Sequence, residues 1–199
     1  MIQNLIFDLG NVLVSYRWKE MLTDDFGIEE SHATLIGHRM FEDPIWKDYD
    51  RGMADTEDLI EHYGHLYPKD SETIRRMFHE SERMMVPRNR LWKRIEELKN
   101  QGFRLYILSN YSEFLFNKHT EHIPFMDKLD GKVVSYEVHK MKPEPEIYRI
   151  LLERYGLKLE ECLFFDDLKE NVCAAKDAGI EAVQVTSEDM LISELDKLL

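Results

Sequence analysis

The feature that most constrains the fold is a repeated alternation of short apolar runs with helical patterns. Apolar residues at helical spacing occur in Pro87–Asn100, Glu144–Tyr155 and Leu168–Ala178, and a glycine follows each segment closely. Strands that alternate with helices are joined by right-handed crossovers, which give a mostly parallel sheet. We therefore predict an α/β fold. Its strands are expected at the apolar runs Leu5–Phe7, Phe103–Leu108, Lys132–Val134, Leu163–Phe165 and Ala182–Val185.

The segment from about Tyr16 to Met85 interrupts this alternation. It shows helical periods, no clear strand, and several glycine and proline breakers. We expect it to be an all-helical insertion of about four helices, residues 16–85, within a core made of residues 1–15 and 86–199. Most of its methionines and aromatic residues should pack inside that bundle, and a few should line a pocket facing the sheet.

Composition limits the partners and the compartment. The 199 residues carry a formal net charge of −13, which disfavours non-specific binding to nucleic acid or to anionic membranes. No secretory signal and no apolar run long enough to span a bilayer is visible, so a cytoplasmic location is expected. Cys162 and Cys173 form no metal-ligand pattern and are expected to be buried thiols.

Polar residues stand where several of the expected strands end. Asp8 follows the first run, Ser109 the second, and Asp166 and Asp167 the fourth. Because open α/β sheets bind ligands beyond the carboxyl ends of their strands, these side chains should converge on one pocket. Three carboxylates there would form an all-oxygen site, which favours Mg²⁺ over zinc. The alternative is that Asp166 and Asp167 only cap the following helix.

Two further segments suit an anion. Ser109 and Asn110 precede a helical pattern at Tyr111–Lys118, where a hydroxyl and free backbone N–H groups would form a phosphate-sized site. An ordinary N-cap role for Ser109 is the alternative. Lys142 lies in the loop Lys140–Pro145, which its prolines stiffen. It can offset the charge of a phosphate and of a nucleophilic carboxylate, or it is simply a solvated loop lysine.

Taken together, these motifs resemble those of the haloacid dehalogenase (HAD) superfamily. The residues that carry the resemblance are Asp-Leu-Gly-Asn-Val at 8–12, Leu-Ser-Asn at 108–110, Lys-Pro-Glu-Pro at 142–145 and Phe-Phe-Asp-Asp-Leu-Lys-Glu-Asn at 164–171. The resemblance implies a Rossmann-like core, and it identifies the insertion with a helical cap of the C1 type. The opening motif is similar to that of the subgroup that contains bacterial α-glucose-1-phosphatases.

By this resemblance the protein is a Mg²⁺-dependent phosphatase of small phosphorylated metabolites, such as α-hexose 1-phosphates. Asp8 would attack phosphorus and form an aspartyl phosphate. The Asp8 side chain, the Gly10 carbonyl and Asp167 would hold Mg²⁺, while Asp166 and Asn171 would orient metal-bound water and the surrounding loop. Phosphoryl transfer mainly needs alignment and charge neutralisation, which such a site provides.

The resemblance also implies the substrate contacts. Ser109 and the Asn110 backbone would hold phosphate oxygens, and Lys142 would offset their charge. In the stretch 41–52 of the insertion, Trp46 could stack on a sugar or base and Arg51 could pair with an anion. The alternative is a helix–helix connection with a packed Trp46. The sequence does not distinguish a monomer from a homodimer.

Position 10 departs from the usual pattern of the superfamily. Most of its phosphatases have a second aspartate two residues after the nucleophile, which protonates the leaving group, and this chain has Gly10. Losing a general acid typically costs about 10²–10⁴ in rate. His38, Asp50 or a water held by Asn11 could replace it. Otherwise the substrate has a good leaving group, as an anomeric sugar phosphate has, or the enzyme is slow.

Other functions stay open. The missing acid is compatible with a non-catalytic binding or regulatory protein on the same scaffold. Metal-independent 2-haloacid dehalogenases of the superfamily also lack the second aspartate, but they generally lack an acidic pair such as Asp166 and Asp167. A phosphomutase normally needs the missing aspartate. In a response-regulator receiver, a helical insertion of this size would not divide the acidic residues.

Overall fold

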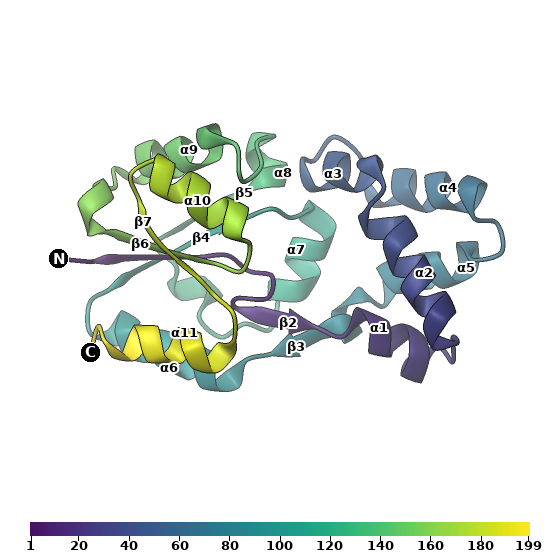
Figure 1. The fold of residues 1–199 in the computed structure, drawn as a ribbon, viewed down its shortest axis with the longest axis horizontal. Helices are drawn as coiled ribbons and strands as arrows, with labels where there is room; N and C mark the ends of the chain where they lie inside the picture. The colour runs from purple at the N-terminus through teal and green to yellow at the C-terminus, as the bar shows by residue number, and fades with distance from the viewer.

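Five parallel strands form the central sheet of the computed structural model, which describes all 199 residues (Figure 1). The strand order is β5-β4-β1-β6-β7. Each strand lies within one residue of its expected position, so the α/β prediction is confirmed. The strands are β1 (Asn4–Phe7), β4 (Arg104–Ser109), β5 (Gly131–Val134), β6 (Cys162–Asp166) and β7 (Glu181–Gln184).

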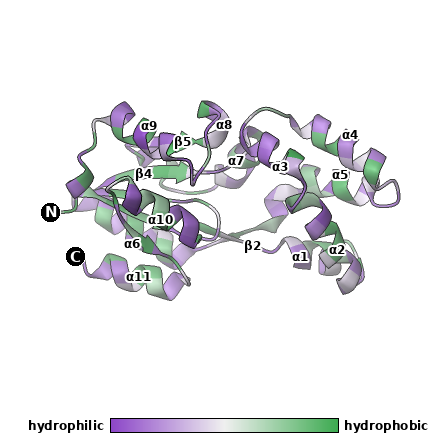
Figure 2. Ribbon diagram, turned by 45° about the horizontal axis from the view of Figure 1, so that its top comes forward, coloured by the Kyte–Doolittle hydropathy of each residue, from purple (hydrophilic) through white to green (hydrophobic).

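Helices cover both faces of this sheet (Figure 1). Because side chains of a strand alternate between faces, Ile6 packs with α9 (Pro145–Tyr155) and α10 (Lys169–Asp177). Its neighbour Phe7 packs on the other side, with α6 (Asn89–Asn100) and α11 (Glu188–Asp196). In Figure 2, hydrophobic and hydrophilic residues alternate along the helices, as expected for helices that pack one side against a sheet.

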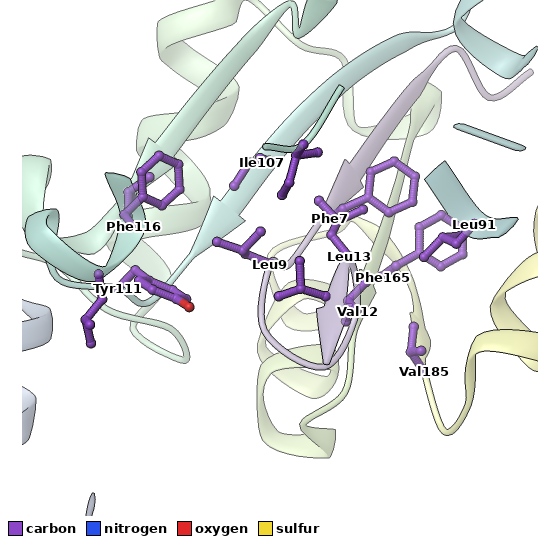
Figure 3. Close-up of a cluster of buried hydrophobic side chains, with 14 of the residues drawn as sticks. Phe7, Leu9, Val12, Leu13, Leu91, Ile107, Tyr111, Phe116, Phe165 and Val185 are labelled. Carbon is purple, nitrogen blue, oxygen red and sulfur yellow. The ribbon is translucent and has the colours of Figure 1, made fainter. Parts of the chain in front are cut away.

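The apolar layer under the site is built around the first strand and the loop that follows it. The rings of Phe7 and Phe165 stack with centroids 5.2 Å apart. In Figure 3, Leu9, Val12 and Leu13 lie beside this pair. The loop after β1 is therefore held by buried side chains, and this fixes the position of Asp8, which begins the loop.

The inserted residues form a group of helices beside the sheet, at the right of Figure 1. Local signals start two of them: the Asp43 carboxylate accepts from Ile45 N–H at the start of one helix, and Asp55 and Asp58 form a capping box at the next. The elements are α1 (Trp18–Glu20), a π-helical turn (Met21–Asp25), α2 (Glu30–Phe41), α3 (Pro44–Asp50), α4 (Thr56–Leu66) and α5 (Ser71–His79).

Two short strands connect this group to the sheet. β2 (Val14–Tyr16) pairs antiparallel with β3 (Met85–Pro87), so the expectation of no strand in 16–85 is wrong at both ends of the segment. Three residues are too few to show a period-two pattern. The domain boundaries at 15/16 and 85/86 fall within this two-stranded sheet and stay a prediction.

Other boundaries shift by a few residues. The helix expected at 111–118 is α7 (Glu113–Thr120), because the chain stays extended through Ser112, which is its N-cap. Ser109 is therefore the last residue of a strand and does not begin a helix. The remaining short elements are the 3₁₀ turns η2 (Ser81–Met84), η3 (Met126–Lys128) and η4 (Leu159–Glu161), and the helix α8 (Ser135–Val138).

Two smaller observations complete the fold. Cys162 is buried, as expected, but Cys173 is exposed, because Val172 and Ala175 form the inner face of α10 and Cys173 lies on the outer one. None of the helices combines the length and the apolar character that crossing a membrane would require.

Candidate active site

Three acidic or hydroxyl side chains meet at the carboxyl edge of the sheet. β1 lies between β4 and β6, with Phe7 paired to Ile107 on one side and to Phe165 on the other. Asp8 therefore stands between Ser109, the last residue of β4, and Asp166, the last residue of β6. The convergence expected from the sequence is what the sheet order produces.

Asp8 has one oxygen held and the other left free. Its Oδ1 accepts from the Leu9 N–H at 2.8 Å, the Ser109 hydroxyl at 2.6 Å and the Lys142 ammonium at 2.9 Å. Its Oδ2 takes part in none of these contacts. Asp8 is 8% exposed. Its orientation is therefore fixed by three donors, and a single oxygen is available for chemistry.

Lys142 is the cation at the centre of the site. Its Nζ lies 2.9 Å from Asp8 Oδ1 and 2.5 Å from Asp166 Oδ2. The side-chain amide of Asn110 holds the lysine's loop: it donates to the Lys142 carbonyl and accepts from the Lys142 N–H, each at 2.8 Å. The Asn110 side chain thus positions the lysine, and phosphate binding by its backbone stays a prediction.

Asp166 has both oxygens engaged. Its Oδ1 accepts from Leu168 N–H at 2.9 Å and from the Asn171 amide at 3.0 Å, and Lys142 takes its Oδ2. Asp167 is half-buried, and Asn11 donates to its Oδ2 at 3.1 Å. The oxygens still available in this cluster therefore belong to Asp8 and Asp167.

These residues fit a hard divalent cation. Asp8, Asp166 and Asp167 each offer a carboxylate oxygen within 4.8 Å of the others. Beside them the Asn171 Oδ1 is buried without a hydrogen-bond partner. Such an acceptor is costly unless something donates to it, and a water carried by a cation would do so. Oxygen ligands of this kind suit Mg²⁺.

Burial and charge act against each other at the two central groups. Burial raises the pKa of Asp8 to about 6, although the Lys142 charge and the Ser109 hydrogen bond oppose the shift. Burial alone would lower the pKa of Lys142, but Asp8 and Asp166 beside it hold that pKa above its usual range. The lysine therefore stays charged and available to offset an anion.

Gly10 leaves room for an aromatic ring. A Cβ at this position would lie 3.3 Å from Tyr16 Cε2 and 3.6 Å from the Tyr16 hydroxyl. Tyr16 therefore fills the space into which a side chain at position 10 would project, which gives a structural reason for the missing aspartate.

The Tyr16 hydroxyl belongs to a buried series of hydrogen bonds that no sequence motif or spacing indicates. It hydrogen-bonds the Tyr111 hydroxyl, which lies 2.6 Å from His119 Nδ1, and His119 Nε2 lies 2.9 Å from the Ser81 carbonyl. A carbonyl only accepts, so Nε2 carries the proton and Nδ1 of the neutral ring accepts from Tyr111. Tyr16 must then donate to Tyr111, and its oxygen offers the site only a lone pair.

His119 should make stability depend on pH. Burial lowers its pKa to about 4, from about 6.5 in an unfolded chain. The neutral ring therefore contributes stability that is present above pH 6.5 and is lost as the pH falls toward 4. Between pH 7 and pH 5 we expect this residue to remove roughly 2 kcal/mol from the free energy of unfolding.

Denaturant unfolding of the wild type and of His119→Gln at the two pH values checks this. Asp8 and Asp50 have raised pKa values and titrate with the opposite sign in the same window, so only the difference between the proteins is informative. The wild type should lose about 2 kcal/mol more than the variant. Equal losses would contradict the expectation.

A cavity of about 300 Å³ opens above Asp8, between the sheet edge and the inserted helices. Ten of its sixteen lining residues are hydrophobic, so the lining of the cavity is mainly apolar. As expected, a few methionines and aromatic residues of the insertion line this cavity. Those from the inserted helices are Trp18, Met40, Phe41, Trp46, Met77 and Phe78.

The expected substrate contacts separate into two groups. Trp46 and Asp50 line the cavity. Arg51 instead forms a salt bridge with Glu144, and His38 is exposed and pairs with Glu42 at 2.6 Å. Contact of Arg51 with an anionic substrate group stays a prediction. In the structure, the guanidinium of Arg51 is already paired with the Glu144 carboxylate.

Residues 50–52 dock the inserted helices on the sheet domain. The Ser135 hydroxyl donates to the Asp50 carbonyl, and His139 Nδ1 lies 2.7 Å from the Arg51 carbonyl. Gly52 has a φ of +69°, and a Cβ there would lie 2.7 Å from the Tyr136 carbonyl oxygen. A side chain is therefore excluded at position 52 by both strain and space.

Together, the sheet order, the inserted helices and the acidic edge define a hydrolase class. The chain belongs to the haloacid dehalogenase-like hydrolases, whose family model matches residues 2–179. The family prediction and the HAD fold are thus confirmed.

Three similar proteins illustrate the range of the family. The sesquiterpene phosphatase astK of Aspergillus oryzae is 26% identical, covering 98% of this chain and 95% of its own. The D-ribitol-5-phosphate phosphatase of Bacteroides thetaiotaomicron is 24% identical and covers 92% of each chain. A crystal structure of a HAD family enzyme from the same bacterium, in complex with magnesium and inorganic phosphate, matches with a TM-score of 0.74 at 20% identity, over 94% of this chain and 96% of that one. At this identity the structural likeness shows the fold alone.

Proposed function

We propose that this protein is a Mg²⁺-dependent phosphatase that hydrolyses small phosphate monoesters through an aspartyl phosphate on Asp8. The observation that carries the proposal is the state of this carboxylate: three donors fix Oδ1, and Oδ2 is left free below a cavity. The phosphatase names of the two curated relatives support the same reaction.

The residues of the site suit each part of the reaction. Asp8 Oδ2 would attack phosphorus as the bond from phosphorus to the ester oxygen breaks. Ser109 and Lys142, both already in contact with Asp8, would hold the phosphoryl oxygens and offset their charge. Water would then hydrolyse the acyl phosphate and return the free carboxylate.

The metal site would be formed by oxygens of the acidic cluster and of the loop after β1. Asp8, the Gly10 carbonyl and Asp167 would hold Mg²⁺, with Asp166 and Asn171 behind them. When bound, the ion would supply charge neutralisation for the phosphoryl group. The acidic cluster also favours a phosphatase over a metal-independent dehalogenase, the less favoured alternative.

We propose that Asp50 protonates the leaving group, the role that an aspartate at position 10 would otherwise have. It lines the cavity together with Asp8 and Gly10. Burial and, less strongly, the charge of Asp8 raise its pKa to about 7, against a backbone hydrogen bond from Ser112. It can therefore give its proton to the departing ester oxygen and, as a carboxylate, take one from the attacking water.

Phosphate release with and without Mg²⁺ is the test of this function. The panel should include p-nitrophenyl phosphate, α-hexose 1-phosphates and alkyl phosphates. We expect Mg²⁺-dependent turnover that a chelator abolishes. Folded protein that binds Mg²⁺ and turns over no ester would overturn the phosphatase and favour the binding-protein alternative; halide release from 2-haloacids would favour the dehalogenase.

Mg²⁺ binding can be measured without activity. An ion that binds only the folded chain stabilises it, so millimolar Mg²⁺ should raise Tm by about 2–8 °C. Asp167→Asn should remove this shift. The matched control is Asp177→Asn, because Asp177 is an exposed aspartate on the same segment outside the cluster, and it should keep the shift. A shift that survives Asp167→Asn would show that the ion binds elsewhere.

A further inference from the structure

We propose that the substrate is the phosphate monoester of an apolar, hydrocarbon-like alcohol rather than of a sugar or a nucleotide. This inference rests on the proposed phosphatase function and names the substrate class of the same site. It is carried by the cavity above Asp8, by the side chains that form its wall, and by the hydrogen bonds that its polar residues already make.

The wall away from the phosphate end is a set of packed aromatic rings. Trp18 and Phe41 meet edge to face at 5.3 Å, and Phe41 and Trp46 do so at 4.8 Å. Phe78 stacks on Trp46 at 6.0 Å. These rings come from α1, α2, α3 and α5, and all of them line one cavity. Such a surface gains free energy by removing hydrocarbon from water.

The remaining contacts of the wall can adapt to the shape of a chain. Met40, Met77 and Met84 line the cavity beside the rings, and unbranched thioether side chains fill irregular space well. Leu115 closes the wall from α7. The cavity is therefore apolar on the side of the inserted helices and also on part of the side of the sheet domain.

Apart from Asp8 and Asp50, which the proposed reaction uses, the polar side chains that line the cavity already have hydrogen-bond partners. Tyr16, Tyr111 and His119 hydrogen-bond one another, and the Asn110 amide holds the backbone of Lys142. A sugar would bring several hydroxyl groups into this space. Each one left unpaired on burial would weaken binding about 5- to 150-fold. An apolar group has no such requirement.

Gly37 determines how much room the cavity has. A Cβ at this position would lie 2.4 Å from the Trp18 ring, so the indole lies directly on the backbone of α2. A methyl group there must displace the ring. The absence of a side chain at position 37 therefore helps to keep the volume of about 300 Å³ open.

A series of n-alkyl phosphates tests the proposal, because their leaving groups have nearly equal pKa values and only the buried length changes. From ethyl to octyl phosphate, kcat/KM should rise by up to about fourfold for each methylene until the cavity is full. Glycerol phosphate and hexose phosphates should fall well below alkyl phosphates of similar size. A flat series, or a preference for the polyol esters, would overturn the proposal.

A binding measurement separates this proposal from the proposed function. Trp18 and Trp46 line the cavity, so tryptophan fluorescence can follow the binding of n-alkylphosphonates to Asp8→Asn. Affinity should rise with chain length in the same way as kcat/KM. Rising affinity without turnover of any ester would keep the apolar ligand and reject the phosphatase, whereas affinity independent of length would reject the apolar ligand.

Matched variants place the effect in the cavity. Trp46→Ala should lower the ratio of kcat/KM for octyl phosphate to kcat/KM for ethyl phosphate about tenfold or more. Gly37→Ala, which retains every cavity side chain, should also shorten the preferred chain. Leu66→Ala is the control, because Leu66 is an exposed leucine on α4 outside the cavity. Loss of chain-length preference in the control, or its retention in both cavity variants, would contradict the assignment.

Discussion

Replacing Asp8 with asparagine is expected to lower phosphate release by about 10⁴-fold or more. The amide keeps the size of the side chain and removes the anionic oxygen that would bond to phosphorus. The Ser109 and Lys142 contacts hold the other oxygen, so the nucleophile has no substitute at this position. Steady-state turnover of p-nitrophenyl phosphate and of one alkyl phosphate measures the loss.

The same variant should remain folded. Burial raises the pKa of Asp8 to about 6. An ionised Asp8 therefore makes the folded chain less stable relative to the unfolded chain than a neutral side chain of the same size would. Lys142 retains its contact with Asp166 when Asp8 loses its charge. Without Mg²⁺, the Tm of Asp8→Asn should therefore be no lower than that of the wild type. Turnover near the wild-type level would show that Asp8 is not the nucleophile.

The second large effect is expected from Asp50→Asn, and it should depend on the leaving group. An alkoxide needs a proton as it departs, so alkyl phosphates should lose about 10²–10³-fold in kcat. The p-nitrophenolate leaves without one, so its ester should lose less than about fivefold. The ratio between the two substrates is therefore the diagnostic quantity.

Asp48→Asn is the control for this substitution, because Asp48 lies on the same helix and is exposed. It should leave both substrates unaffected. A structural role for Asp50 would lower both activities together, and an unchanged ratio would reject the assignment. The pH profile gives a second readout: the fall in kcat above the pKa of Asp50, which is about 7, should be absent in Asp50→Asn.

The sheet and its acidic edge were predictable because their signals are local. Each central strand is buried on both faces and reads as a short apolar run, and the residue after the run is then placed at the edge by the topology. The convergence of Asp8, Ser109 and Asp166 could therefore be predicted from the apolar runs and the parallel topology alone.

The contacts that join distant segments were not predictable in this way. Tyr16 meets Tyr111 across 95 positions, and Arg51 meets Glu144 across 93. Neither pair has a spacing or a motif that marks it. Whether Met77 packs in a core or lines a cavity is likewise decided by the placement of whole helices, which helical periodicity does not contain.

The docking of residues 50–52 links the position of the inserted helices to the chemistry of the site. Arg51 holds Glu144, which lies two residues after Lys142 in one short loop, and Asp50 precedes Arg51 directly. If the inserted helices moved away from the sheet, the proposed proton donor would leave the site and the Lys142 loop would lose its Arg51–Glu144 contact in the same movement. The open protein would then admit water and exchange product while its acid is out of reach. The site would thus be open to solvent in one position of the inserted helices and able to protonate a leaving group in the other.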